Sequence, residues 1–173
     1  MIKRIVSVLI LIFLLSGCSG GKIEPRLCGI SFRAVMDYYN ESYSFEGRIS
    51  DEGVLTATMT EPQELKNLEF TLDSQGTIVN YKGLTFTPVE GSIPFCRMID
   101  EFYSKISELI NEQELTVNSD GAISRGKGAK EFTLTLTPLG LPQTLKMPDE
   151  RFIVKFYNIQ ITNEDVNEQG KIS

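Results

Sequence analysis

The sequence contains no histidine and no tryptophan. Without histidine the chain cannot build the Ser-His-Asp or Cys-His arrangements that activate a nucleophile, and it lacks the commonest protein ligand for zinc. The missing tryptophan weakens the case for a carbohydrate-stacking surface. The three cysteines, Cys18, Cys28 and Cys96, have no CxxC spacing, so neither a zinc cluster nor a thioredoxin-type site is predicted. We expect no metal and no cofactor.

Paired carboxylates are the remaining candidates for acid–base chemistry, as in the glycosidases. The pairs in this chain are Asp51 with Glu52, Asp100 with Glu101, and Asp149 with Glu150. Each pair falls in a predicted turn or on the polar face of a predicted helix, where a solvated charge is the ordinary explanation. We therefore predict that the protein is not an enzyme.

Basic residues are outnumbered, 17 against 23 acidic ones, and the formal net charge is −6. An acidic surface repels the phosphates of nucleic acids and of anionic lipids. No run of basic residues offsets this charge locally. The composition predicts neither nucleic-acid binding nor electrostatic attachment to a membrane.

The N-terminus has the pattern of a secretion signal. Lys3 and Arg4 precede an apolar run over residues 5–15, which is too short for a membrane span of about 20 residues but fits the apolar core of a signal peptide. The run ends in Leu15-Ser16-Gly17-Cys18, and this motif resembles the processing site of bacterial lipoproteins.

The resemblance implies that Cys18 is the site of lipid attachment and that residues 1–17 are the signal peptide. Two or three acyl chains on Cys18 would hold the protein stably in a membrane, on the extracytoplasmic face of the cell envelope. Loss of Lys3 and Arg4 would change the net charge from −6 to −8. The alternative is an ordinary signal peptide cleaved near Gly17 or Ser19, with Cys18 incidental.

The rest of the chain has the length of one domain. We predict a lipidated cysteine and flexible tether over residues 18–27, a folded domain over 28–162 and a polar tail over 163–173. Alternation of apolar and polar residues predicts strands near 30–38, 43–50, 54–60, 68–73, 77–82 and 84–86. Further strands are expected over 114–117, 122–125, 132–137 and 151–161.

The spacing of apolar residues changes from that of a strand to that of a helix near residues 92–111. Ser92 and Pro94 are suited to a helix start. An apolar stripe then follows at helical spacing, formed by Phe95, Ile99, Phe102, Ile106 and Leu109. We predict a mainly β (α+β) fold in which a curved antiparallel sheet, or incomplete β-barrel, of about 8–10 strands carries one amphipathic helix across its concave face.

This pattern is similar to the half-barrel of the periplasmic lipoprotein carriers and related small anchored lipoproteins. The segments that carry the resemblance are 45–49, 60–62, 68–70 and 81–86. It implies a cavity between sheet and helix that binds a lipid, a lipopeptide or another apolar ligand. The candidate lining residues are Phe32, Phe45, Phe70, Phe95, Ile99, Phe102 and Ile106.

Two alternatives remain open at this stage. The aromatic residues either line a ligand cavity or simply fill the core, in which case the domain is a structural module that docks another envelope protein. Cys28 and Cys96 either form a disulfide, which an extracytoplasmic location allows, or remain two free thiols that pack as small apolar residues.

Overall fold

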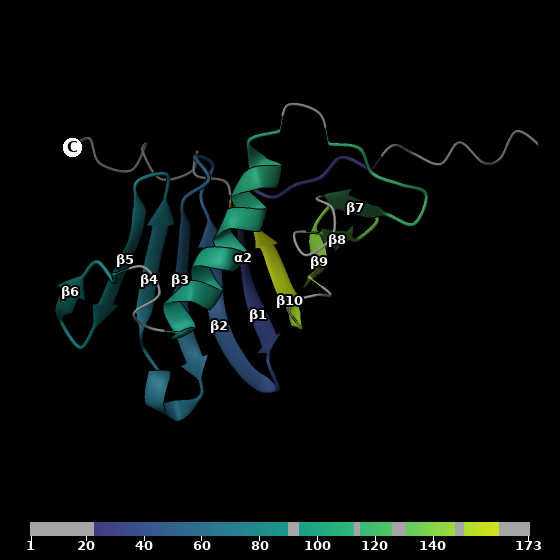
Figure 1. The fold of residues 1–173 in the computed structure, drawn as a ribbon. Helices are drawn as coiled ribbons and strands as arrows, with labels where there is room; N and C mark the ends of the chain where they lie inside the picture. Colours follow the sequence, from purple (N-terminus) through teal and green to yellow (C-terminus); the bar gives the residue numbers. More distant parts are fainter. Residues whose placement is uncertain (1–22, 90–93, 113–114, 126–130, 148–150, 163–173) are drawn as a thin grey trace, which may run out of the picture.

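In the part of the chain that the structure describes, ten strands form one antiparallel sheet that curves around one α-helix (Figure 1). The computed structural model describes residues 23–89, 94–112, 115–125, 131–147 and 151–162. Neighbours in the sheet follow the order β6-β5-β4-β3-β2-β1-β10-β9-β8-β7. The described sheet is open, with β6 at one edge and β7 at the other. The predicted mainly β fold with one helix is therefore confirmed.

Several consecutive strands are joined by tight turns. The first half of the sheet contains β1 (Ile30–Tyr38), β2 (Glu41–Ile49), β3 (Leu55–Glu61), β4 (Glu69–Asp73), β5 (Gly76–Tyr81) and β6 (Leu84–Phe86), with a 3-10 turn η1 (Gln63–Leu65) between β3 and β4. Helix α2 (Pro94–Ile110) follows. The second half contains β7 (Ala122–Arg125), β8 (Phe132–Leu136), β9 (Pro142–Met147) and β10 (Phe152–Ile161).

Alternation along each strand decides which face is buried. In β1, Ile30, Phe32, Ala34 and Met36 are buried and face the helix, while Arg33 between them is exposed. Successive strand residues point to opposite sides of a sheet, so one face collects the apolar side chains. Helix α2 lies across this concave face (Figure 1) and its apolar stripe completes the core.

Two details of the predicted strands are wrong. The segment 115–117, expected to be a strand, pairs with no neighbour, although Leu115 and Val117 pack against the core; Glu114 lies outside the described residues. Strand β9 was not predicted. The pairing of β8 with β9 shifts register between Thr135 and Leu136, and such a bulge interrupts the simple alternation by which a strand is recognised.

The folded domain begins earlier in the chain than the sequence predicted. Leu27 is buried, and the Arg26 amide donates a hydrogen bond of 2.8 Å to the carbonyl oxygen of Gly140 in the β8–β9 turn. Ile23 packs against the core. Residues 23–27 therefore belong to the folded domain, because backbone pairing and side-chain burial hold them against it. The rest of the predicted tether and the polar tail lie outside the described residues.

Candidate functional site

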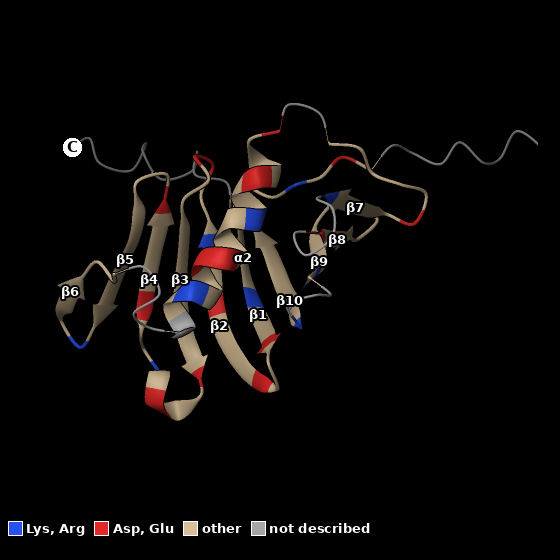
Figure 2. Cartoon of the chain, viewed as in Figure 1, with Lys and Arg blue, Asp and Glu red and all other residues tan. Residues whose placement is uncertain are grey.

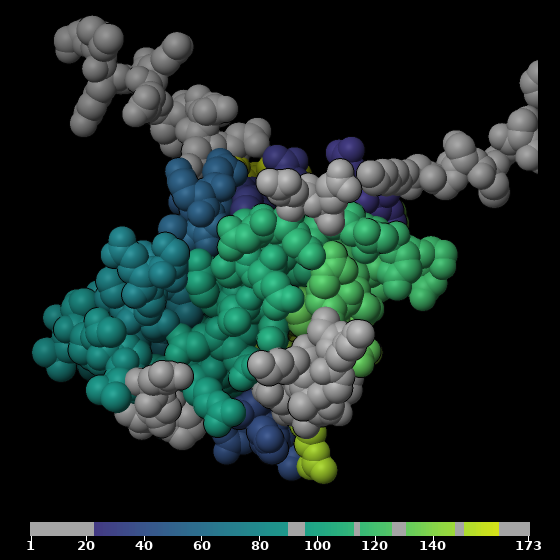
Figure 3. Space-filling view, turned by 45° about the horizontal axis from the view of Figure 1, so that its top comes forward, coloured from purple at the N-terminus to yellow at the C-terminus, as the bar shows by residue number. Residues whose placement is uncertain are grey.

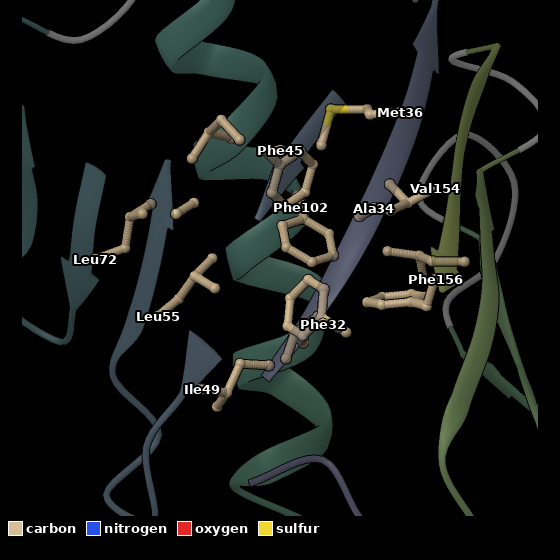
Figure 4. Close-up of a cluster of buried hydrophobic side chains, with 14 of the residues drawn as sticks. Phe32, Ala34, Met36, Phe45, Ile49, Leu55, Leu72, Phe102, Val154 and Phe156 are labelled. Atoms are coloured by element: carbon tan, nitrogen blue, oxygen red, sulfur yellow. The ribbon is translucent and has the colours of Figure 1, made fainter. Parts of the chain in front are cut away.

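The candidate cavity residues are packed against one another. The Phe102 ring from α2 lies 5.8 Å from the Phe45 ring and 5.9 Å from the Phe156 ring, measured between centroids. Phe32 lies 6.2 Å from Phe45 and 5.1 Å from Phe156. Most of these contacts are edge-to-face, the arrangement that aromatic rings favour in cores. Figure 4 shows the rings directed toward each other between the helix and the sheet.

These side chains form the core of the domain. The six described candidates are no more than 4% exposed: Phe32, Phe45, Phe70, Ile99, Phe102 and Ile106. The side chain of Phe95 lies outside the described residues. In the space-filling view the helix abuts the strands on either side of it (Figure 3). Of the two interpretations left open by the sequence, core packing is the one that this geometry supports.

A groove of about 350 Å³ lies at the C-terminal end of the helix. Its apolar lining comes from Leu27, Cys28, Leu109, Ile110 and Leu115. Leu27 and Leu109 are buried, and the other three side chains are partly buried. The groove therefore offers apolar surface beside the point at which the N-terminal segment joins the domain.

The opposite, outer face of the sheet carries two neighbouring depressions of about 560 and 380 Å³. Arg33 on β1 and Glu46 on β2 line both of them, and their side chains form an ion pair at 2.8 Å. The larger depression lies where β10 bulges at Asn158, which has a positive φ of 50°. The smaller one is bordered by Tyr157, which is 47% exposed.

We refer to this surface, formed by β1, β2, β3 and β10, as the outer-face patch. Its members are Arg33, Val35, Ser44, Glu46, Glu61 and Tyr157. The Ser44 hydroxyl donates a hydrogen bond of 3.1 Å to Glu61. The patch combines one cation, two carboxylates, an aliphatic side chain and an aromatic ring. Arginine and tyrosine are enriched at protein interfaces.

The outer-face patch was not predicted from the sequence. Its members stand at the outward positions of alternating strands, where exposed residues are expected and carry no signal by themselves. The one available signal was Tyr157, an aromatic residue at an outward position. The bulge that opens the surface beside it cannot be read from the sequence.

Cys28 and Cys96 are free thiols, so the disulfide considered from the sequence is not formed. Cys96 lies in the first turn of α2, whereas Cys28 lies beside Leu109 at the other end. The helix between these ends is about 20 Å long at about 1.5 Å per residue. A disulfide needs Cα atoms about 5–6 Å apart.

Burial makes both thiols weak acids. Desolvation, with a smaller contribution from Asp100, raises the pKa of Cys96 to about 11. Desolvation and then the charge of Asp51 raise the pKa of Cys28 above its usual 9.0. Because the thiolate is the reactive and metal-binding form, the raised pKa values disfavour that form in both side chains.

The two carboxylate pairs that the structure describes lie on separate elements. Asp51 and Glu52 lie in the β2–β3 turn, and Asp100 and Glu101 lie on α2, where Asp100 accepts a hydrogen bond from the Thr77 hydroxyl. Asp149 and Glu150 lie outside the described residues. Within the described ranges, no three His, Cys, Asp or Glu side chains are grouped so as to hold a metal ion.

Charged residues of both signs occur along α2, within several strands and in the turns (Figure 2). In the part of the chain that the structure describes, no helix has the length and apolar character needed to cross a membrane. Comparison with models of known protein families found no match, and comparison with curated proteins found no sequence of significant similarity.

Proposed function

We propose that the protein is a bacterial lipoprotein, anchored through Cys18 on the extracytoplasmic face of a membrane, whose domain is a non-catalytic docking module for another envelope protein. The observation that carries the docking proposal is the contrast between the two faces of the sheet. The concave face is occupied by α2 and its aromatic contacts. The outer face presents the hollowed outer-face patch.

The composition of the outer-face patch suits a polar partner surface. The Arg33–Glu46 ion pair is largely solvent-exposed, so water screens the attraction between the two charges. Each side chain can therefore leave the other and bind a partner instead. Lys155 and Asp37, 3.8 Å apart, extend the charged surface along β10 and β1. Val35 and Tyr157 supply apolar area between these charges. A partner is expected to carry both carboxylates and basic groups.

The anchor is tested by metabolic labelling with a palmitate analogue. Wild-type protein is expected to incorporate the label and to remain with the membrane fraction, whereas Cys18→Ser is expected to lose both. Cys28→Ser is the matched control, because it removes a different thiol and leaves the proposed lipid site intact. Equal labelling of Cys18→Ser and wild type would contradict the proposed anchor.

The docking surface is tested by photo-crosslinking in living cells. A photoreactive amino acid replaces Tyr157 in one variant and Ile78 in the other, since both side chains are 47% exposed. Ile78 lies outside the outer-face patch, on β5. We expect a crosslinked protein of one defined mass at position 157 only, lost when Arg33→Glu reverses the charge. Indistinguishable crosslinks at the two positions would exclude specific docking there.

A second candidate function is binding of a small apolar ligand, which the half-barrel resemblance implied. The groove at the end of α2, lined by Leu27, Leu109 and Leu115, is the observation that favours it. Mass spectrometry of organic extracts from the purified domain would detect a stoichiometric lipid, expected to be absent from a Leu109→Glu variant. An extract without lipid would rule out this candidate.

A further inference from the structure

The N-terminal segment reaches the domain at one particular corner. Besides the hydrogen bond from Arg26 to Gly140, the backbone of Glu24 lies so close to Gly140 that a Cβ atom there would stand 1.8 Å from the Glu24 oxygen. The Ile23 side chain approaches Gly121, at the start of β7. Residues 23–26 therefore run from the turn at Gly121 past the β8–β9 turn, and the chain that leads back to Cys18 leaves the domain at this corner.

The distance from this corner to the proposed lipid is short. A fully extended chain covers about 3.3–3.6 Å per residue, so the path from Cys18 to Ile23 spans at most about 18 Å. If Cys18 carries acyl chains, the corner of the domain at Ile23 is confined to the neighbourhood of the bilayer surface. Tyr38, at the other end of β1, lies about 26 Å from Ile30, at about 3.3 Å per residue.

Among the described residues, four turns project from this end of the sheet, where β1 begins and where β2 and β10 end. They comprise residues 50–54, 73–76, 118–121 and 137–141. The first three contain Asp51 and Glu52, Asp73, and Asp120, respectively (Figure 2). The fourth has the sequence Thr-Pro-Leu-Gly-Leu and no charge.

The uncharged turn also carries the most exposed large apolar side chain among the described residues. Leu139 is 80% exposed, although the turn around it is well ordered by hydrogen bonds from Gly140 to Thr137 and from Thr137 to Leu141. An apolar side chain held at a rigid tip can enter the boundary between lipid headgroups and acyl chains, where aliphatic residues gain from burial. The carboxylates of the three acidic turns are instead better solvated in water.

We propose that the β8–β9 turn, through Leu139, rests in the interface of the bilayer that holds Cys18. The inference rests on the proposed lipid anchor and specifies how the domain sits on it. The contact fixes one corner of the domain at the membrane. The acidic turns and the outer-face patch then remain in water.

The absence of tryptophan from the chain allows a direct test. Leu139→Trp places the only tryptophan at the turn, and the exposed site accommodates it. The lipidated full-length variant is reconstituted in phosphatidylcholine vesicles with brominated acyl chains, which quench tryptophan on contact. We expect its fluorescence to fall at least two-fold relative to unbrominated vesicles.

Two matched variants give the reference values. Tyr39→Trp probes an exposed position at the far end of β1, 56% exposed in the native protein, and Gln75→Trp probes an acidic turn at the same end as Leu139. Neither is expected to be quenched beyond a few per cent. Quenching at position 75 equal to that at 139 would contradict a contact confined to the uncharged turn.

Flotation of the same samples separates the two proposals. Protein that floats with the vesicles but shows no quenching at position 139 would leave the anchor in place and overturn the membrane contact. Emission from position 139 that shifts to shorter wavelength without bromine quenching would indicate burial against protein, and would also overturn it. Protein that does not float would refute the anchor and with it this inference.

Discussion

Phe32 on β1 and Gly47 on β2 stand directly opposite each other, and the Phe32 ring covers the position that a side chain at residue 47 would fill. A Cβ atom at residue 47 would lie 2.6 Å from the Cζ atom of Phe32. The ring in turn contacts Phe45 and Phe156. A glycine within a strand thus makes room for the aromatic cluster that meets the helix.

Gly47→Ala is therefore expected to destabilise the domain by about 1–3 kcal/mol, the usual cost of overpacking a core. Without the Phe32 contact, alanine would instead be favoured over glycine within a strand. The free energy of unfolding is measured by urea denaturation. The cost should shrink in a Phe32→Leu background, which removes the clashing atoms. An equal cost in both backgrounds would show that the ring is not responsible.

Phe102→Ala tests whether the concave face is a filled core. Phe102 is fully buried and contacts rings from two strands, so its truncation is expected to cost about 3–5 kcal/mol. Phe86→Ala is the control, because Phe86 is 41% exposed on the edge strand β6, and a much smaller loss is expected. A Phe102→Ala protein as stable as wild type would indicate a cavity that tolerates lost volume.

The fold was largely predictable because its signals are local. The alternation in residues 30–38 and the helical spacing of Ile99, Phe102 and Ile106 depend only on neighbours along the chain. The same helical stripe is compatible with a filled core and with a ligand cavity. The choice between them depends on the summed volume of side chains from distant strands, such as Phe32 and Phe156.

The candidate surfaces were not predictable for a related reason. The proposed role of Leu139 depends on the contact between Arg26 and Gly140, which are far apart in the sequence. The outer-face patch depends on the bulge at Asn158, where two residues of β10 oppose one of β1. Sequence patterns report which face a residue occupies, but not which distant turn lies beside it.

We expect the raised pKa of Cys96 to cause a loss of folding stability at high pH. Its folded pKa of about 11 exceeds the usual 9.0, so the unfolded chain releases this proton first. The contribution of the protonated thiol to the free energy of unfolding is intact below about pH 9 and is lost as the pH rises toward 11. In Cys96→Ala this part of the pH dependence should be missing. Parallel stability curves for the two proteins between pH 8 and about pH 11 would contradict the assignment.

Gly140→Ala should release the segment that joins the domain to Cys18. The new methyl group would stand 1.8 Å from the Glu24 oxygen, a backbone atom that can yield only if the segment moves away. Gly83→Ala is a close control, because Gly83 also has a positive φ, 84° against 78°, but no atom lies within 4 Å of the position that its Cβ would take. Both substitutions should share the backbone cost of about 1–2 kcal/mol.

Limited proteolysis distinguishes this release from simple backbone strain. Trypsin cleaves after Arg26, and in the wild type the hydrogen bond to Gly140 and the burial of Leu27 hold that peptide bond against the domain. A protease needs the segment to detach and extend, so cleavage should be slow in wild type and in Gly83→Ala. In Gly140→Ala the fragment that begins at Leu27 should form several-fold faster, as followed by mass spectrometry. Equal rates in the two alanine variants would mean that the β8–β9 turn does not hold the segment, and the corner by which the domain meets its anchor would then have to lie elsewhere.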